Sequence, residues 1–143
     1  MIITDVNLLV YAYSSKSSFH TEARAWWEDL LNHQEPVAVP WVCVLGFIRL
    51  VTHAKVLEMP MTPEAAITHV QSWFERPNVE RLEPGPRHLE FLSKMVSAAG
   101  TAGNLTTDVH LAALAVEHQC ELHSNDADFA RFPGLKWTNP LQR

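Results

Sequence analysis

Three aspartates stand at similar places in the chain, each where a helical pattern begins. Asp5 follows the short strand-like run that contains Ile2 and Ile3, and Asp126 follows the strand-like run at residues 121–124. Asp108 opens the helical pattern that ends at residue 118. The carboxyl ends of parallel strands meet at one edge of a sheet, where ligands collect. We therefore expect the three side chains to gather at one site.

Carboxylates that gather within a few ångströms repel one another unless a cation joins them. Oxygen ligands favour Mg²⁺ or Mn²⁺, which keep several waters and bind phosphate directly. One ion, or two about 4 Å apart, would lower the pKa of a bound water and stabilise charge on the attacked and leaving oxygens. The pattern predicts metal-assisted hydrolysis of a phosphodiester, with Asp5, Asp108 and Asp126 as catalytic metal ligands.

Several polar residues close to these acids in the sequence fit supporting roles. Asp128 is near enough to Asp126 to be a fourth ligand, or it is a solvated residue of a first helical turn. Asn7, Thr107 and Ser124 supply small amide or hydroxyl groups beside the acids. Any one of the acids could instead simply cap a helix, because Asp is favoured at that position.

Two side chains are candidates for binding substrate. Arg49 could hold a phosphate, or it could pair with a surface acid. His110 stands two residues after Asp108 and could touch substrate, although a structural role is favoured. The eight histidines include no close pair of the kind found in zinc enzymes, since His110 and His118 are eight residues apart.

The segments that must position these residues alternate between strand and helix patterns. Strands are predicted near residues 2–3, 37–39, 79–82, 121–124 and 136–137, and helices near residues 8–13, 19–31, 41–53, 63–76, 89–99, 110–118 and 126–131. This alternation predicts a parallel sheet with helices on both faces. With 143 residues and no linker or repeat, we expect one domain spanning residues 1–143.

The composition limits the function classes. At 47% hydrophobic and 19% charged residues the chain is typical of globular proteins. No apolar run approaches the roughly 20 residues that a membrane span needs, and the N-terminal residues lack a secretion signal. Cys43 and Cys120 lie in apolar segments, which favours buried thiols and a cytoplasmic location. The net charge of −5 counts against nucleic-acid binding, although bound cations would reverse the local sign.

Three segments together resemble the PIN-domain toxins of the VapC type. They are I-T-D-V-N at residues 3–7, T-D-V-H-L-A-A-L-A at residues 107–115 and S-N-D-A-D-F at residues 124–129, in the order and spacing of that family. The resemblance covers the chain from end to end. It implies a three-layer fold with a parallel five-stranded sheet, cleavage of RNA with Mg²⁺ or Mn²⁺, a homodimer, and inhibition by a small cognate antitoxin.

One position departs from the family pattern. These toxins usually carry a Glu on the helix after the second strand, and here Gly46 stands where that acid is expected. The remaining aspartates would then hold the metal with less negative charge, which puts a second ion in doubt. The W-x-x-x-L-G-F-I-R stretch around Gly46 resembles a subgroup variant.

The aromatic residues suggest a surface for the antitoxin. Trp26, Trp27 and Trp41 exceed what the predicted core needs, so we expect an apolar helix of the antitoxin to pack against them.

Two other function classes compete with the nuclease. An aspartate-based phosphatase would want D-x-D after the first strand, whereas this chain has Asp5-Val6-Asn7. A catalytically weakened PIN-fold interaction module is favoured by Gly46 and by the net acidity. Substitution of Asp5 separates these classes, because an interaction module would lose no activity.

Overall fold

The chain builds a five-stranded parallel sheet. The computed structural model describes residues 1–100 and 106–141. The strand order is β3-β2-β1-β4-β5, and every neighbouring pair is parallel, so β1 lies at the centre. The strands are β1 (Ile2–Thr4), β2 (Val37–Ala38), β3 (Val79–Glu80), β4 (Glu121–His123) and β5 (Lys136–Thr138).

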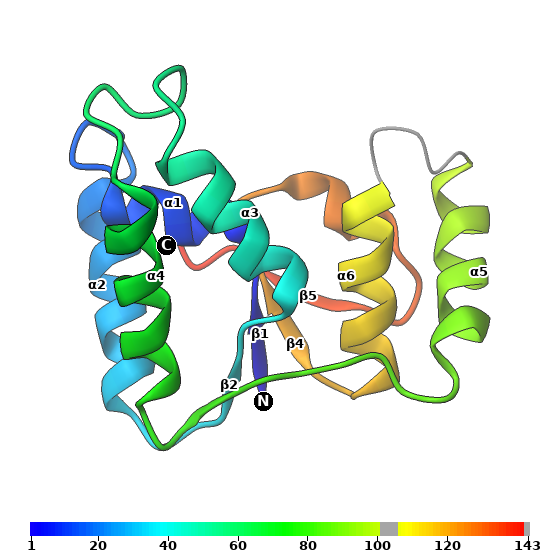
Figure 1. Cartoon of the computed structure of the whole chain (residues 1–143). Coiled ribbons are helices and arrows are strands. Elements are labelled where there is room, and N and C mark those ends of the chain that lie inside the picture. The colour runs from blue at the N-terminus through cyan, green and yellow to red at the C-terminus, as the bar shows by residue number, and fades with distance from the viewer. Residues whose placement is uncertain (101–105, 142–143) are drawn as a thin grey trace.

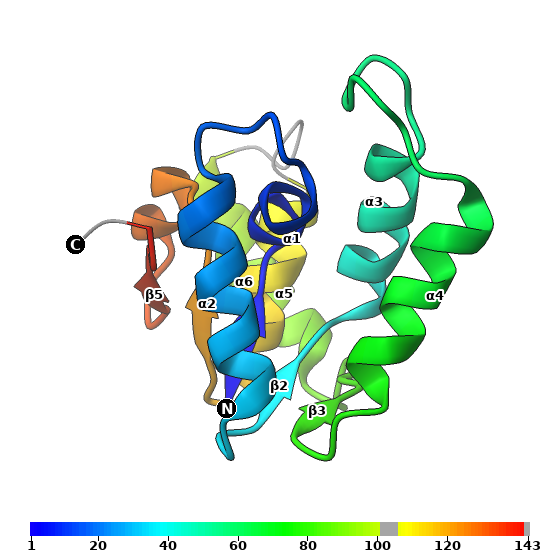
Figure 2. The same cartoon turned by 90° about the vertical axis from the view of Figure 1, so that its left-hand side faces the viewer.

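Helices cover the sheet on both sides. In Figure 1, α2 and α4 lie to the left of the sheet and α6 to its right, with α5 packed on the outer side of α6. Figure 2, turned by 90°, shows α2 in front of the sheet and α5 and α6 behind it. The helices are α1 (Val6–Tyr13), α2 (His20–Asn32), α3 (Trp41–Val51), α4 (Pro63–Phe74), α5 (His88–Ala99) and α6 (Thr106–Glu117), with a short 3₁₀ helix, η2 (Ala127–Arg131).

The core lies between the sheet and the two helical layers. All three residues of β1 are buried, as are the five consecutive residues from Leu111 to Ala115 of α6. An aromatic cluster joins α2, α3 and α4, because the ring of Trp73 meets Trp27 at 5.5 Å and Phe47 at 4.8 Å, both edge to face. This packing fixes the carboxyl ends of the strands, from which α1, α3 and η2 depart (Figure 1).

The predicted elements are present, with differences at their ends. The strand expected at residues 79–82 ends at Glu80, and the helix expected to reach residue 53 ends at Val51, where the hydroxyl of Thr52 turns back to the carbonyl of Ile48 at 2.7 Å. α6 begins at Thr106, two residues before Asp108. Residues 103–105 of the expected loop lie outside the described residues.

Two predictions from composition can be compared with this fold. Cys43 and Cys120 are free and buried, as expected from their apolar surroundings. Within the described residues, no helix has both the length and the apolar character needed to cross a membrane.

Candidate active site

Asp5 lies at the junction of β1 and α1 and caps the helix. Its Oδ1 accepts a hydrogen bond from the backbone N–H of Val6 at 2.7 Å, and only 5% of the residue is exposed. Burial raises the pKa of Asp5, hydrogen bonds from Ser124 and Val6 oppose that rise, and the charge of Asp126 adds to it. Asp5 is therefore both a helix cap and a buried acid at the end of the central strand.

Ser124 connects the acids that follow β1 and β4. Its buried hydroxyl donates to Oδ2 of Asp5 at 2.7 Å and accepts from the backbone N–H of Asp126 at 3.0 Å. The side-chain amide of Asn7 donates to the same hydroxyl at 3.4 Å. One hydroxyl thus contacts Asp5, Asn7 and Asp126 at the carboxyl edge of the sheet.

Asp108 lies in the first turn of α6 and is partly buried. Its pKa is raised to about 6, first by burial and then by the charges of Asp5, Asp126 and Asp128, against which Arg131 acts weakly. Burial is the largest of these causes, and the charges of the other acids add to it. Asp108 therefore lies within electrostatic reach of the acids on the loops after β1 and β4.

Asp126 and Asp128 differ in their surroundings. Asp126 caps η2, and its Oδ1 accepts from the backbone N–H of Asp128 at 2.9 Å. Asp128 is exposed and pairs with the guanidinium of Arg131 at 3.0 Å. Arg131 was not singled out in the sequence, although its i, i+3 spacing from Asp128 was a visible signal. Because Asp128 already has a cationic partner, it is the weakest of the four candidate metal ligands.

The residues at this edge fit a hard divalent cation in their chemistry. All are oxygen donors, and the repulsion recorded in the raised pKa of Asp108 is what a cation would relieve. Oδ1 of Asn7 is buried and lacks a hydrogen-bond partner, so it could accept from a water bound to an ion. Among the described residues, however, no three His, Cys, Asp or Glu side chains already converge closely enough to hold a metal ion.

Three other expected site residues lie on α3 and α6. Arg49 is exposed in the last turn of α3, and Thr107 is exposed in the first turn of α6. His110 makes its side-chain contact with His88 of α5, with their ring nitrogens 3.0 Å apart. The pKa of His110 is lowered by burial and by the neighbouring His88.

Gly46 brings α3 close to the start of α1. A Cβ atom placed on Gly46 would lie 3.2 Å from Cγ2 of Val6, the residue after Asp5. Cys43, one turn earlier on α3, is also near enough for the charge of Asp5 to raise its thiol pKa, after burial as the main cause. Gly46 therefore packs against Val6, the residue that follows Asp5, and this contact leaves little room for a side chain.

The three tryptophans do not form a common surface, so that expectation was wrong. Trp27 is 2% exposed and belongs to the core. The indole of Trp26 donates to Nδ1 of His123 at 2.9 Å. Only Trp41 is exposed, at 45%, and it lines a groove between α3 and α4 together with Ile67 and Phe74.

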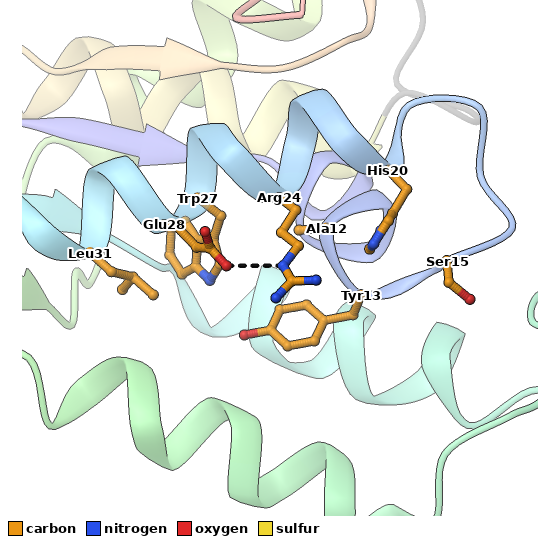
Figure 3. A pocket seen from close by; sticks show the side chains of 8 residues that line it. All are labelled: Ala12, Tyr13, Ser15, His20, Arg24, Trp27, Glu28 and Leu31. Atoms are coloured by element: carbon orange, nitrogen blue, oxygen red, sulfur yellow. Dashed lines mark hydrogen bonds and ion pairs between the residues drawn. The ribbon is translucent and has the colours of Figure 1, made fainter.

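A cavity of about 420 Å³ lies elsewhere, along α1 and α2. Figure 3 shows Arg24 and Glu28 paired along the α2 wall, with the ring of Tyr13 below and His20 and Ser15 toward one end; the Arg24–Glu28 distance is 2.9 Å. None of the four aspartates lines this cavity. Its walls therefore belong to a different part of the surface from the acidic site.

Comparison with known proteins yields one consistent group. A family model described as the PIN domain matches residues 2–135. The chain is 45% identical over 142 residues to Ribonuclease VapC33 of Mycobacterium tuberculosis, which covers 99% of both chains.

Solved structures share the fold at low sequence identity. One is VapBC2 from Rickettsia felis bound to a DNA fragment from its promoter, with TM-score 0.69, 16% identity, and 97% of this chain and 98% of that chain covered. Another is a toxin–antitoxin complex from Klebsiella pneumoniae, with TM-score 0.64, 17% identity, and 98% of both chains covered.

Proposed function

The chain belongs to the PIN-domain family, as a VapC-type ribonuclease, and on that basis we propose that it is an endoribonuclease that depends on Mg²⁺ or Mn²⁺. The observation that carries this proposal is the hydrogen-bonded link from Asp5 through Ser124 to Asp126 at the carboxyl edge of the sheet. Asp108 is near enough for the charges of these acids to add to the rise that burial gives its pKa.

The metal would be held by Asp5, Asp108 and Asp126, with Asp128 as an outer acid that stays paired to Arg131. When bound, it would supply an activated water and stabilise charge on the phosphate. Ser124 fixes the orientation of the Asp5 carboxylate, and that carboxylate is already aligned by the N–H of Val6. The acids therefore bind and orient, and no covalent enzyme intermediate is needed.

RNA binding would need cations near the acidic site. Arg131 pairs with Asp128 and its charge also acts on Asp108, and Arg49 is exposed on α3. We propose phosphate contacts for both side chains. A metal bound by the acids would reverse the local negative charge, and this would offset the unfavourable net charge of −5.

The partner of such a nuclease would be a small antitoxin protein. The relevant support is that one structural neighbour is a toxin–antitoxin complex. We propose that an apolar segment of the antitoxin enters the α3–α4 groove, which is lined by Trp41, Ile67 and Phe74 and measures about 550 Å³. A homodimer and a cytoplasmic location, where the two thiols stay reduced, complete the proposal.

The test is cleavage of a mixed pool of structured RNA by purified protein, with Mg²⁺, with Mn²⁺ and with a chelator. Wild type should cut only with a metal, and Asp5→Asn and Asp108→Asn should each abolish cutting. Asp29→Asn, at an acid on α2, is the matched control and should cut normally. Failure of the wild type to cut with either metal would instead favour the interaction module.

A further inference from the structure

Two histidines from different helices meet where α5 packs against α6. Nε2 of His88, the first residue of α5, lies 3.0 Å from Nδ1 of His110 on α6, and the two rings are edge to face at 4.9 Å. Two ring nitrogens at this distance share one proton, since one must donate and the other accept. The two nitrogens therefore face each other between the helices, one with a free lone pair and the other with the proton.

A buried carboxylate holds the first of these rings. Glu117, at the end of α6, accepts from Nδ1 of His88 at 3.3 Å. Its two oxygens also accept from the backbone N–H groups of Gly85 and Arg87, both at 3.0 Å. The side chains of His88 and Glu117 are only 11% and 7% exposed, so neither ring nor carboxylate is free to turn away.

From this arrangement we infer that His88 and His110 form a binding site for a divalent transition ion such as Zn²⁺, separate from the acidic site. Imidazole nitrogens suit Zn²⁺, Ni²⁺ and Cu²⁺, whereas carboxylate oxygens suit Mg²⁺ and Mn²⁺. A histidine that binds a metal usually donates its other N–H to a carboxylate, which fixes its tautomer. His88 already makes that contact with Glu117.

The geometry needs only a small adjustment. Two Zn–N bonds of about 2.1 Å at a tetrahedral angle place the nitrogens about 3.4 Å apart, against 3.0 Å here. The proton now shared between the rings moves to Nε2 of His110, so both facing nitrogens become ligands. Because no third His, Cys, Asp or Glu converges on this point in the described part of the chain, water completes the coordination.

A metal ion bound by His88 and His110 would cross-link α5 to α6. α5 packs chiefly on α6, and α6 carries Asp108 in its first turn. Ion binding would therefore stabilise the helix pair without using any acid of the proposed nuclease site.

The experiment is titration of untagged, metal-free protein with ZnCl₂, followed by calorimetry and by thermal unfolding, in excess Mg²⁺ to keep the acidic site occupied. Co²⁺ is a second probe, because its visible absorption reports nitrogen ligands. Wild type should bind one Zn²⁺ with a raised midpoint of unfolding. His88→Gln and His110→Gln should each weaken binding at least tenfold, and Glu117→Gln should weaken it about tenfold or more.

Two variants serve as matched controls. His118→Gln removes another histidine of the same region, and Asp108→Asn disables the acidic site; both should still bind the ion. Absence of Zn²⁺ binding by the folded wild type, or undiminished binding by His88→Gln, would overturn the inference. Loss of RNA cleavage in Asp108→Asn with retained Zn²⁺ binding separates this site from the proposed nuclease centre.

Discussion

The hydroxyl of Ser124 donates to Oδ2 of Asp5 at 2.7 Å, across 119 residues of sequence. This bond joins the loop after β4 to the loop after β1, and the same hydroxyl accepts from the N–H of Asp126. A single side chain therefore sets the relative positions of two proposed metal ligands.

Ser124→Ala should lower RNA cleavage and metal affinity by about 10- to 100-fold, because Asp5 loses the donor that orients it. Unfolding should become easier by about 1–3 kcal/mol, since a buried acceptor is left without its partner. Metal titration of cleavage rates measures the first effect and urea unfolding the second. The control is Ser93→Ala, at an exposed serine of α5, and cleavage by Ser124→Ala at the wild-type rate would refute the positioning role.

Asp108 should couple metal binding to pH. Its pKa is raised to about 6 by burial and by the charges of the other acids, so protons compete with the metal below that value. Metal affinity measured between pH 5 and pH 8 should fall as the pH drops through about 6. The metal concentration that gives half-maximal cleavage should rise in step, and an affinity that stays constant across this range would contradict the prediction.

Ionised Asp108 should lower the stability of the metal-free protein at neutral pH. The pKa of Asp108 is higher in the folded state than its ordinary value of 3.8, so its contribution to stability is full below pH 3.8 and is lost as the pH rises through about 6. Asp108→Asn should therefore stabilise the metal-free protein at pH 7.5 by about 1 kcal/mol, a figure discounted for solvent screening. Urea unfolding at pH 4 and pH 7.5 tests this, with a clear gain expected only at pH 7.5.

The contact with Val6, and not the backbone conformation, should be what favours glycine at position 46. Alanine in a helix is favoured over glycine by about 1 kcal/mol, but a Cβ at residue 46 would meet Cγ2 of Val6 at 3.2 Å. Gly46→Ala should thus change stability by less than about 0.5 kcal/mol in wild type. In a Val6→Ala background the same change should stabilise by about 1 kcal/mol. Equal effects in the two backgrounds would show that this contact is unimportant.

Much of the fold was predictable because its signals are local. The short run Ile2–Thr4 begins with two isoleucines, and it forms the buried central strand. The acids after β1 and β4 come together because parallel strands place their carboxyl ends at one edge. The position of Ser124 was predictable for the same reason, since this residue directly follows β4.

Other contacts depend on how helices pack, and a local pattern does not contain that information. His88 and His110 are 22 residues apart and meet only because α5 lies against α6. Trp26 and Trp27 are neighbours in the sequence, yet successive residues of a helix point about 100° apart. Trp27 therefore faces the core while Trp26 turns to His123, and the predicted aromatic surface does not form.

The exposed Trp41 should contribute to antitoxin binding. Trp41→Ala should weaken binding of the cognate antitoxin by about tenfold or more, as for an aromatic anchor in a groove. Trp27→Ala should instead lower stability by about 3–5 kcal/mol, because it empties a core position. Leu89→Ala is the control, at a side chain that is 79% exposed on α5. Calorimetry should show the loss for Trp41→Ala alone among folded variants, and unchanged affinity would move the interface elsewhere.

His123 should make the protein less stable in mild acid. Burial lowers the pKa of His123, only partly opposed by Glu121, and Nδ1 must stay unprotonated to accept from the indole of Trp26 at 2.9 Å. A lowered pKa means that the stability contribution is present above the unfolded value of about 6.5 and is lost as the pH falls. Free energies of unfolding from pH 7.5 to pH 5 should therefore drop more steeply in wild type than in His123→Gln, whose amide can still accept from Trp26. His33→Gln, at an exposed histidine, should keep the wild-type slope; identical slopes in all three proteins would mean that His123 does not drive the change.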